Sequence, residues 1–211
     1  MVVAVEYISK EESADVAEGA ASAQHGVTGI LAVQGAFAEH AAMLDRLGVP
    51  WKLLRAAEDF DDSIDRVILP GGESTVMGKL LRDLDLFETL QEKIRAGLPV
   101  YGTCAGLILL ADQVEGGIPC FATMDLTAKR NAYGRQLGSF HTVAQMEGVG
   151  EIPMTFIRAP YIAAVGPKAQ VLAEVDGHIV AARQGNQLVT AFHPELDEDT
   201  SVHQYFLDMT K

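Results

Sequence analysis

Short apolar segments alternate with helical patterns from residue 30 onward, and this alternation restricts the fold more than any other feature of the chain. Residues 30–34 (ILAVQ) are almost wholly apolar, which is typical of a strand buried on both faces. Apolar side chains then recur at helical spacing over residues 36–47, and Gly48 and Pro50 end that helix. Further elements follow in alternation, with strands expected at 51–54, 66–69 and 99–103 and helices at 75–84, 87–95 and from 105 to 111. This order predicts a parallel sheet covered by helices.

The second half of the chain has a different pattern. Short strand candidates are separated by Gly, Pro or polar turns, at residues 141–146, 154–157, 171–175, 179–183 and 188–192. They favour hairpins added to the parallel sheet, followed by a last helix at 201–209. We therefore expect one α/β domain over residues 30–211, with three layers, a mostly parallel sheet and helices on both faces. In such open sheets the functional groups lie at the carboxyl ends of the strands.

Residues 1–29 differ from the rest of the chain. After a short strand-like run they are polar, acidic and rich in Ala, and they match neither a secretory signal nor a mitochondrial presequence. We expect a poorly ordered extension. An added strand or a partner contact is the alternative.

The charge balance excludes several kinds of partner. Sixteen Lys and Arg against 29 Asp and Glu give a net charge of −13, and the sequence pI is near 4.8. So acidic a surface repels nucleic acid and anionic lipid, and no apolar run reaches the ~18 residues of a membrane-spanning helix. Two cysteines cannot form a disulfide framework, so we expect a reduced, cytoplasmic protein. The chain has no recognisable phosphate cradle or Schiff-base lysine, and we expect neither cofactor nor metal.

The strongest local motif is GTCAG at residues 102–106, between an apolar strand and a helix. A nucleophile between two glycines at a strand-to-helix turn is the nucleophile elbow, here with Cys104 in place of Ser. The helix N-terminus favours a thiolate, and the N–H of Ala105 can stabilise an oxyanion. The plain alternative is a buried structural cysteine, which is how we interpret Cys120.

A cysteine nucleophile needs a base, and His193 is the best candidate of six histidines. It follows a strand-like run and begins His-Pro-Glu, so the proline turn can direct the histidine and Glu195 to the same side. Glu195 would then fix the tautomer of the imidazole. A surface histidine beside an acidic segment is an equally good interpretation of these three residues alone.

LPGGEST at residues 69–75 also follows a strand. Two glycines let backbone amides approach a ligand, and we expect Gly72 to be a second oxyanion donor beside Ala105. The segment lacks the Gly-Lys-Ser/Thr of a phosphate loop. It is also read as a helix cap through Ser74 or Thr75, which is compatible with the oxyanion role.

Together, LPGGEST, GTCAG and HPEL resemble the class I glutamine amidotransferases, which have a flavodoxin-like fold and a Cys-His-Glu triad. Other segments narrow the resemblance to the glutaminase subunits of pyridoxal 5′-phosphate synthase, over residues 30–211: ILAVQGAFAEH at 30–40, KRNAYGRQLGSF at 129–140, FIRAP at 156–160 and TAFHPEL at 190–196. The extension at 1–29 departs from this family, whose members mostly lack it.

The resemblance implies a role for each matching residue. Cys104 would attack the side-chain amide of L-glutamine, with His193 as base and acid and Glu195 orienting it. The glutamine would contact Gly72, Glu73, Ser74, Arg130, Ile157 and Arg158. Ammonia would pass through a channel to a synthase subunit, and Gln34 would face that partner.

Two alternatives remain for this class of chain. The glutaminase of another synthase, such as imidazole glycerol phosphate synthase, is disfavoured by the QGAFAEH and RNAYGRQ segments. A non-catalytic binding module is disfavoured by the intact set of Cys104, His193 and Glu195.

Overall fold

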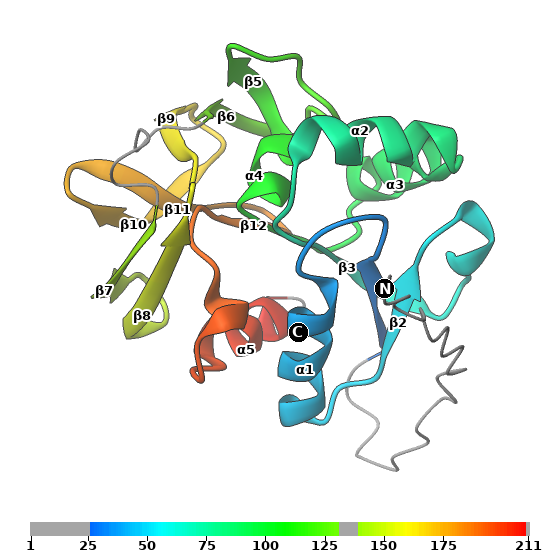
Figure 1. Cartoon of the computed structure of the whole chain (residues 1–211), viewed down its shortest axis with the longest axis horizontal. Helices are drawn as coiled ribbons and strands as arrows, with labels where there is room; N and C mark the ends of the chain where they lie inside the picture. The colour runs from blue at the N-terminus through cyan, green and yellow to red at the C-terminus, as the bar shows by residue number, and fades with distance from the viewer. Residues whose placement is uncertain (1–25, 131–138, 210–211) are drawn as a thin grey trace, which may run out of the picture.

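The computed structural model describes residues 26–130 and 139–209 of the chain (Figure 1). Most of the N-terminal extension and the centre of the KRNAYGRQLGSF segment therefore lie outside the described residues, and the order expected for the extension stays a prediction. The described chain has a mostly parallel central sheet between two layers of helices, so the expected fold class is confirmed.

The central sheet has ten strands. Five of them run parallel and form one half, in the order β2 (Trp51–Leu54), β1 (Val27–Leu31), β3 (Ile64–Leu69), β4 (Val100–Thr103) and β12 (Gln187–Thr190). The other half continues from β12 through β11 (His178–Gln184), β9 (Tyr161–Val165), β6 (Met124–Lys129) and β5 (Ala111–Glu115), with β10 (Gln170–Val175) paired to β11. Its contacts are antiparallel except for β5 with β6.

Helices lie on both sides of the parallel half (Figure 1). One side carries α2 (Ser74–Asp83), α3 (Leu86–Arg95) and the short α4 (Ala105–Leu110), and the other carries α1 (Phe37–Leu47) and α5 (Ser201–Asp208). Single 3-10 turns occur at η1 (Ala57–Asp59) and η2 (Pro194–Leu196). The core contains five fully buried aromatic side chains: Tyr101, Phe121, Phe156, Phe192 and Phe206.

The structure differs from expectation at several elements. The first strand begins at Val27 and ends at Leu31, so residues 32–34 belong to the following loop. The helix after GTCAG ends at Leu110, because Ala111 already pairs with Met124 in the sheet. Strands β5, β6 and β9 were not expected, although β6 alternates buried and half-buried residues as a strand should.

The hairpin formed by β7 (Ser139–Met146) and β8 (Gly150–Ile157) is a separate two-stranded sheet. We expected it to extend the main sheet. Instead it packs beside β10 and η2. The rings of Phe140 and Phe156 are stacked within the hairpin, and Phe156 lies against Phe192 of the core with ring centroids 5.8 Å apart. The β8 strand thereby reaches the loop that contains His193.

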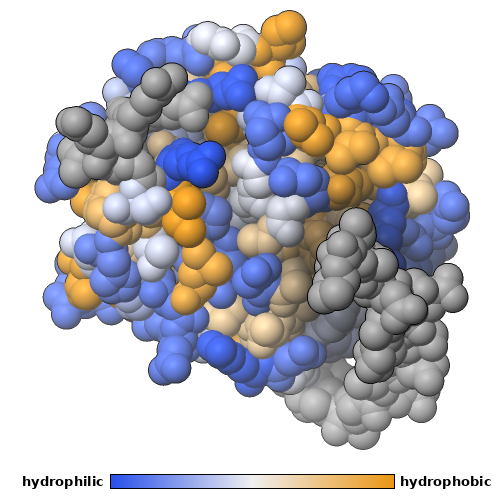
Figure 2. Space-filling view, in the orientation of Figure 1, coloured by the Kyte–Doolittle hydropathy of each residue, from blue (hydrophilic) through white to orange (hydrophobic). Residues whose placement is uncertain are grey.

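Figure 2 shows one face of the molecule that is mostly hydrophilic, with hydrophobic side chains in separate groups. Within residues 26–130 and 139–209, no helix has the length and apolar character needed to cross a membrane.

Candidate active site

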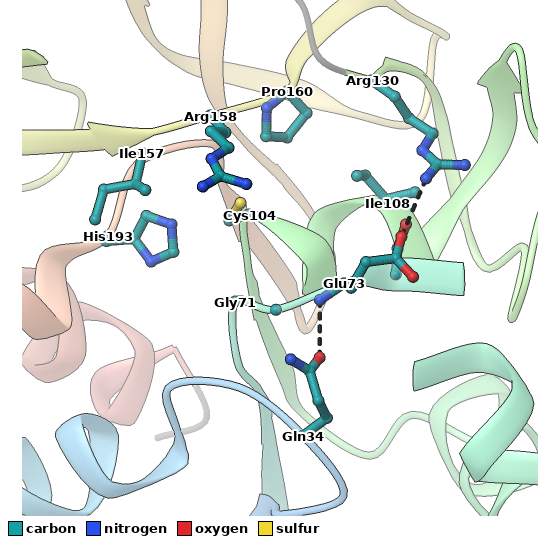
Figure 3. Close-up of a pocket in the computed structure, with 12 residues that line it drawn as sticks. Gln34, Gly71, Glu73, Cys104, Ile108, Arg130, Ile157, Arg158, Pro160 and His193 are labelled. Atoms are coloured by element: carbon teal, nitrogen blue, oxygen red, sulfur yellow. Dashed lines mark hydrogen bonds and ion pairs between the residues drawn. The ribbon is translucent and has the colours of Figure 1, made fainter. Parts of the chain in front are cut away.

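Three adjacent parallel strands, β3, β4 and β12, end at the same edge of the sheet. Each is followed by one of the sequence motifs, so LPGGEST, GTCAG and HPEL meet there. They border a cavity of about 450 Å³ (Figure 3), lined by Gln34, Gly71, Gly72, Glu73, Ser74, Cys104, Ile108, Arg130, Ile157, Arg158, Pro160 and His193. Every residue expected to contact glutamine is in this lining.

Cys104 lies at a strained turn between β4 and α4. Its φ of 48° and ψ of −95° are unusual for a residue with a side chain, and its N–H donates to the carbonyl oxygen of Thr190 at 2.8 Å. A Cβ on Gly106 would be 2.1 Å from the carbonyl oxygen of Leu69, and one on Gly102 would be 2.6 Å from the Gly106 backbone. The glycines of the motif are therefore required by close backbone approach at both ends of the turn.

His193 lies between Cys104 and Glu195. Its Nδ1 is 2.7 Å from Oε1 of Glu195, which leaves Nε2 as the ring nitrogen available to Cys104. The backbone N–H of His193 donates to the carbonyl oxygen of Thr155 on β8 at 2.8 Å. The hairpin therefore helps to fix the position of the imidazole.

The environment of His193 favours its charged form. Burial lowers the pKa of His193, but the hydrogen bonds and charges of Cys104 and Glu195 outweigh burial and raise the pKa to about 10. With this pKa the ring is an imidazolium at neutral pH. This is the protonation state that a thiolate nucleophile requires of its partner.

The glycine loop after β3 lies directly beside this pair. The carbonyl oxygen of Gly71 accepts a hydrogen bond from the N–H of Ala36 at 3.0 Å. The Oε1 atom of Gln34 accepts one from the N–H of Glu73 at 2.8 Å. Two contacts from the loop after β1 therefore hold the Gly71–Gly72 backbone at the edge of the cavity.

The cap of α2 is Glu73, whereas the sequence suggested Ser74 or Thr75. Glu73 has an extended backbone, and its carboxylate accepts the N–H groups of Thr75 at 3.2 Å and Val76 at 2.8 Å. Although burial raises the pKa of Glu73, these bonds and the charge of Arg130 lower it overall. The Arg130 guanidinium donates to Oε1 of Glu73 and to Oγ1 of Thr75, each at 3.2 Å.

The second arginine of the cavity, Arg158, has a different environment. It follows β8 with a left-handed backbone, φ 44°, and its side chain is directed into the cavity (Figure 3). Among the described residues it makes no ion pair. Ile157 beside it is 41% exposed and supplies apolar wall.

Sequence reasoning missed several residues of this region. Ile108 and Pro160 line the cavity, as does Gln34, which was expected at the partner surface. Behind Glu195 lie His40, Thr103 and His203, all fully buried.

Within residues 26–130 and 139–209, no group of three or more His, Cys, Asp or Glu side chains is arranged to hold a metal ion.

Comparisons with known proteins agree with this geometry. The model of the SNO glutamine amidotransferase family matches residues 30–211. The chain is 60% identical over 190 residues to the pyridoxal 5′-phosphate synthase subunit PdxT of Bifidobacterium longum, covering 87% of this chain and 100% of that protein. It is 64% identical over 181 residues to PdxT of Methanocorpusculum labreanum, covering 86% and 96%.

Solved structures give the same result. A crystal structure described as a glutamine amidotransferase is 40% identical, with a TM-score of 0.83 and coverage of 87% of this chain and 98% of that one. A putative GMP synthase subunit from Thermoplasma acidophilum, 18% identical with a TM-score of 0.61, shares the fold. With the family model spanning the whole α/β domain and identities of 60% and more to curated relatives, the chain belongs to the SNO family of glutamine amidotransferases.

Proposed function

We propose that this protein hydrolyses L-glutamine to L-glutamate and ammonia through Cys104, His193 and Glu195, as the glutaminase subunit of a pyridoxal 5′-phosphate synthase. The observation that carries this proposal is the placement of His193, which is bonded to Glu195 at 2.7 Å and lines the same cavity as Cys104.

The reaction follows from these positions. The Cys104 thiolate attacks the side-chain carbonyl carbon of glutamine, and the electron pair of the C=O bond moves to oxygen. His193 then gives its proton to the leaving nitrogen, which departs as ammonia and leaves a thioester on Cys104. His193, now neutral, takes a proton from water as that water attacks the thioester, and glutamate leaves with the thiolate restored.

Two backbone N–H groups would stabilise the oxyanion. Ala105 is the first residue of α4, where N–H groups have no partner within the helix. The second group is the N–H of Gly72. The carbonyl of Gly71 is held by Ala36, and in a trans peptide the following N–H points away from that carbonyl. This contact therefore fixes the direction of the Gly72 N–H.

The cavity carries charges that suit a zwitterionic amino acid. Arg158, which has no carboxylate partner among the described residues, is positioned to take the α-carboxylate, and Arg130 supplies a second guanidinium. Glu73 offers its carboxylate to the α-ammonium group. Gly72, Ser74 and Ile157 complete the wall along the side chain.

The curated relatives are named as subunits of a synthase, which supports a second chain as partner. We propose that the ammonia passes to that synthase subunit through a channel, and that the complex is cytoplasmic. Neither nucleic acid nor a membrane is part of this proposal.

Ammonia release from glutamine, measured with and without a cognate synthase subunit, tests the function. We expect turnover in the complex that Cys104→Ala abolishes, while Cys120→Ser, which lies outside the cavity lining, keeps the wild-type rate. Full turnover by Cys104→Ala, or none by the wild-type complex, would reject the proposal.

A further inference from the structure

Two buried histidines continue the line of groups beyond Glu195. His40 on α1 and His203 on α5 are both fully buried, and Nε2 of His203 is 2.9 Å from Nδ1 of His40. On its other side, Nε2 of His40 is 3.2 Å from Oγ1 of Thr103 and 3.6 Å from Oε2 of Glu195. The reaction described above uses neither histidine.

The carboxylate itself needs such a neighbour. Oε1 of Glu195 is bonded to His193, whereas Oε2 is buried and has no hydrogen-bond partner among the described residues. An unpaired buried carboxylate oxygen is costly, and the cost is reduced when an N–H dipole points at it. His40 Nε2 is the ring nitrogen that lies near this oxygen.

We assign one tautomer to each ring. Nε2 of His40 lies near both Oγ1 of Thr103 and the Glu195 carboxylate. A bare nitrogen there would direct its lone pair toward the carboxylate, so we assign the proton to Nε2 and make Nδ1 the acceptor. His203 must then donate from Nε2, which leaves its Nδ1 as a bare acceptor. Nδ1 of His203 is buried and has no hydrogen-bond partner among the described residues, and an unpaired acceptor is tolerated better than an unpaired N–H.

We propose that His40, oriented by His203, is a positioning residue that directs its Nε2–H at Glu195 and keeps this carboxylate aligned with His193. The proposal rests on the proposed function. It adds two members, from α1 and α5, to the support of the Cys-His-Glu set.

Both added rings act as neutral dipoles. Burial, followed by the charges of His203 and His193, holds the pKa of His40 well below its usual value. Burial lowers the pKa of His203 to about 4. Besides these two and His193, Tyr101 also faces Glu195, and its pKa is raised by burial and by the charge of Glu195.

Two amide variants of His40 separate positioning from packing. The terminal nitrogen of Gln can replace Nε2 of histidine, whereas that of Asn replaces only Nδ1. In the complex with the synthase subunit, His40→Asn should lower kcat at least about tenfold and change KM less than threefold. The alkaline limb of kcat/KM should move down by at least half a pH unit, because a displaced Glu195 raises the pKa of His193 less. His40→Gln should stay within about threefold of wild type in kcat, with the wild-type alkaline limb.

Active-site titration with an electrophilic glutamine analogue gives rates per functional site, so that loss of folded protein does not imitate a loss of rate. His203→Gln and His203→Asn repeat the comparison one residue further out, where Gln keeps the Nε2 donor. His203→Asn should lose more activity than His203→Gln, and this comparison remains available even if the His40 variants do not fold.

Equal losses for Asn and Gln without a shift of the alkaline limb, at whichever position folds, would show a purely structural role and overturn the inference. If the wild-type complex is active, Cys104→Ala is inactive and the Asn and Gln variants show these equal losses, this inference alone is rejected. An inactive wild-type complex would reject the proposed function, and the inference with it.

Discussion

A Cβ on Gly71 would lie 2.3 Å from Cε1 of His193 and 3.4 Å from Cβ of Cys104. The backbone of the glycine loop therefore touches the imidazole directly, and the space between β3 and the catalytic pair has no room for a methyl group. Gly71 limits how far the ring can move as much as Glu195 does.

Gly71→Ala should therefore displace the imidazole. We expect kcat for ammonia release to fall about a hundredfold or more, because a misplacement of ~1 Å has that effect in active sites. Gly78→Ala is the matched control, since a Cβ there meets only ordinary contacts at 3.5 Å and farther, and it lies within α2. Equal activity of the two variants would contradict the close contact.

The raised pKa of His193 predicts an alkaline loss of stability. The folded protein holds this proton up to about pH 10, whereas an unfolded histidine releases it near 6.5. The contribution of His193 to the free energy of unfolding is complete below pH 6.5 and is lost as the pH rises through about 10. Over this range the free energy of unfolding falls by at most about 1.4 kcal/mol per pH unit. Urea unfolding at several pH values should show this decline in the wild type and not in His193→Gln. Parallel curves for the two proteins would contradict the shift.

The meeting of the three motifs could be predicted because each directly follows a strand, and parallel strands present their carboxyl ends at one edge. The apolar runs were sufficient to identify β3, β4 and β12. The fold class therefore followed from local patterns and the right order of elements.

The support behind Glu195 could not be predicted in the same way. His40 and His203 are 163 residues apart, and only the packing of α1 against α5 brings them together. The cap of α2 was missed because Ser74 is the better N-cap by residue type, while the longer Glu73 side chain folds back onto two N–H groups. Strand β5 was missed because its polar residues, exposed on one side, carry little apolar pattern.

Arg158 is expected to contribute mainly to glutamine binding. Its guanidinium has no partner among the described residues, so Arg158→Ala leaves no buried carboxylate unpaired. We expect KM for glutamine to rise about ten- to a hundredfold, the range of a hydrogen bond to a charged group, with a smaller change in kcat. The exposed Arg55→Ala should leave KM unchanged. If both variants keep the wild-type KM, Arg158 does not bind the substrate.

Glu73 should contribute to stability as well as to binding. Glu73→Ala removes the cap of α2 and should lower the free energy of unfolding by about 1 kcal/mol. The pKa of Glu73 is lower in the folded protein than its unfolded value of about 4.5. The charged cap therefore stabilises the folded protein at pH values above 4.5. This stabilisation is lost as the pH falls through the lower pKa of the folded protein. Urea unfolding at pH 7 and pH 3 should thus show a larger difference between wild type and variant at pH 7. An equal difference at both values would contradict the role of the charge.

The two cysteines should differ sharply in reactivity. Cys104 lines the cavity together with His193. Burial raises the pKa of Cys120 by more than Arg82 lowers it, so this thiol holds its proton. At pH 7 an electrophilic glutamine analogue should modify Cys104, added glutamine should slow that modification, and Cys120 should remain free. Peptide mapping by mass spectrometry measures both sites at once, and modification of Cys120 ahead of Cys104 would show that the reactive thiolate is not at the elbow.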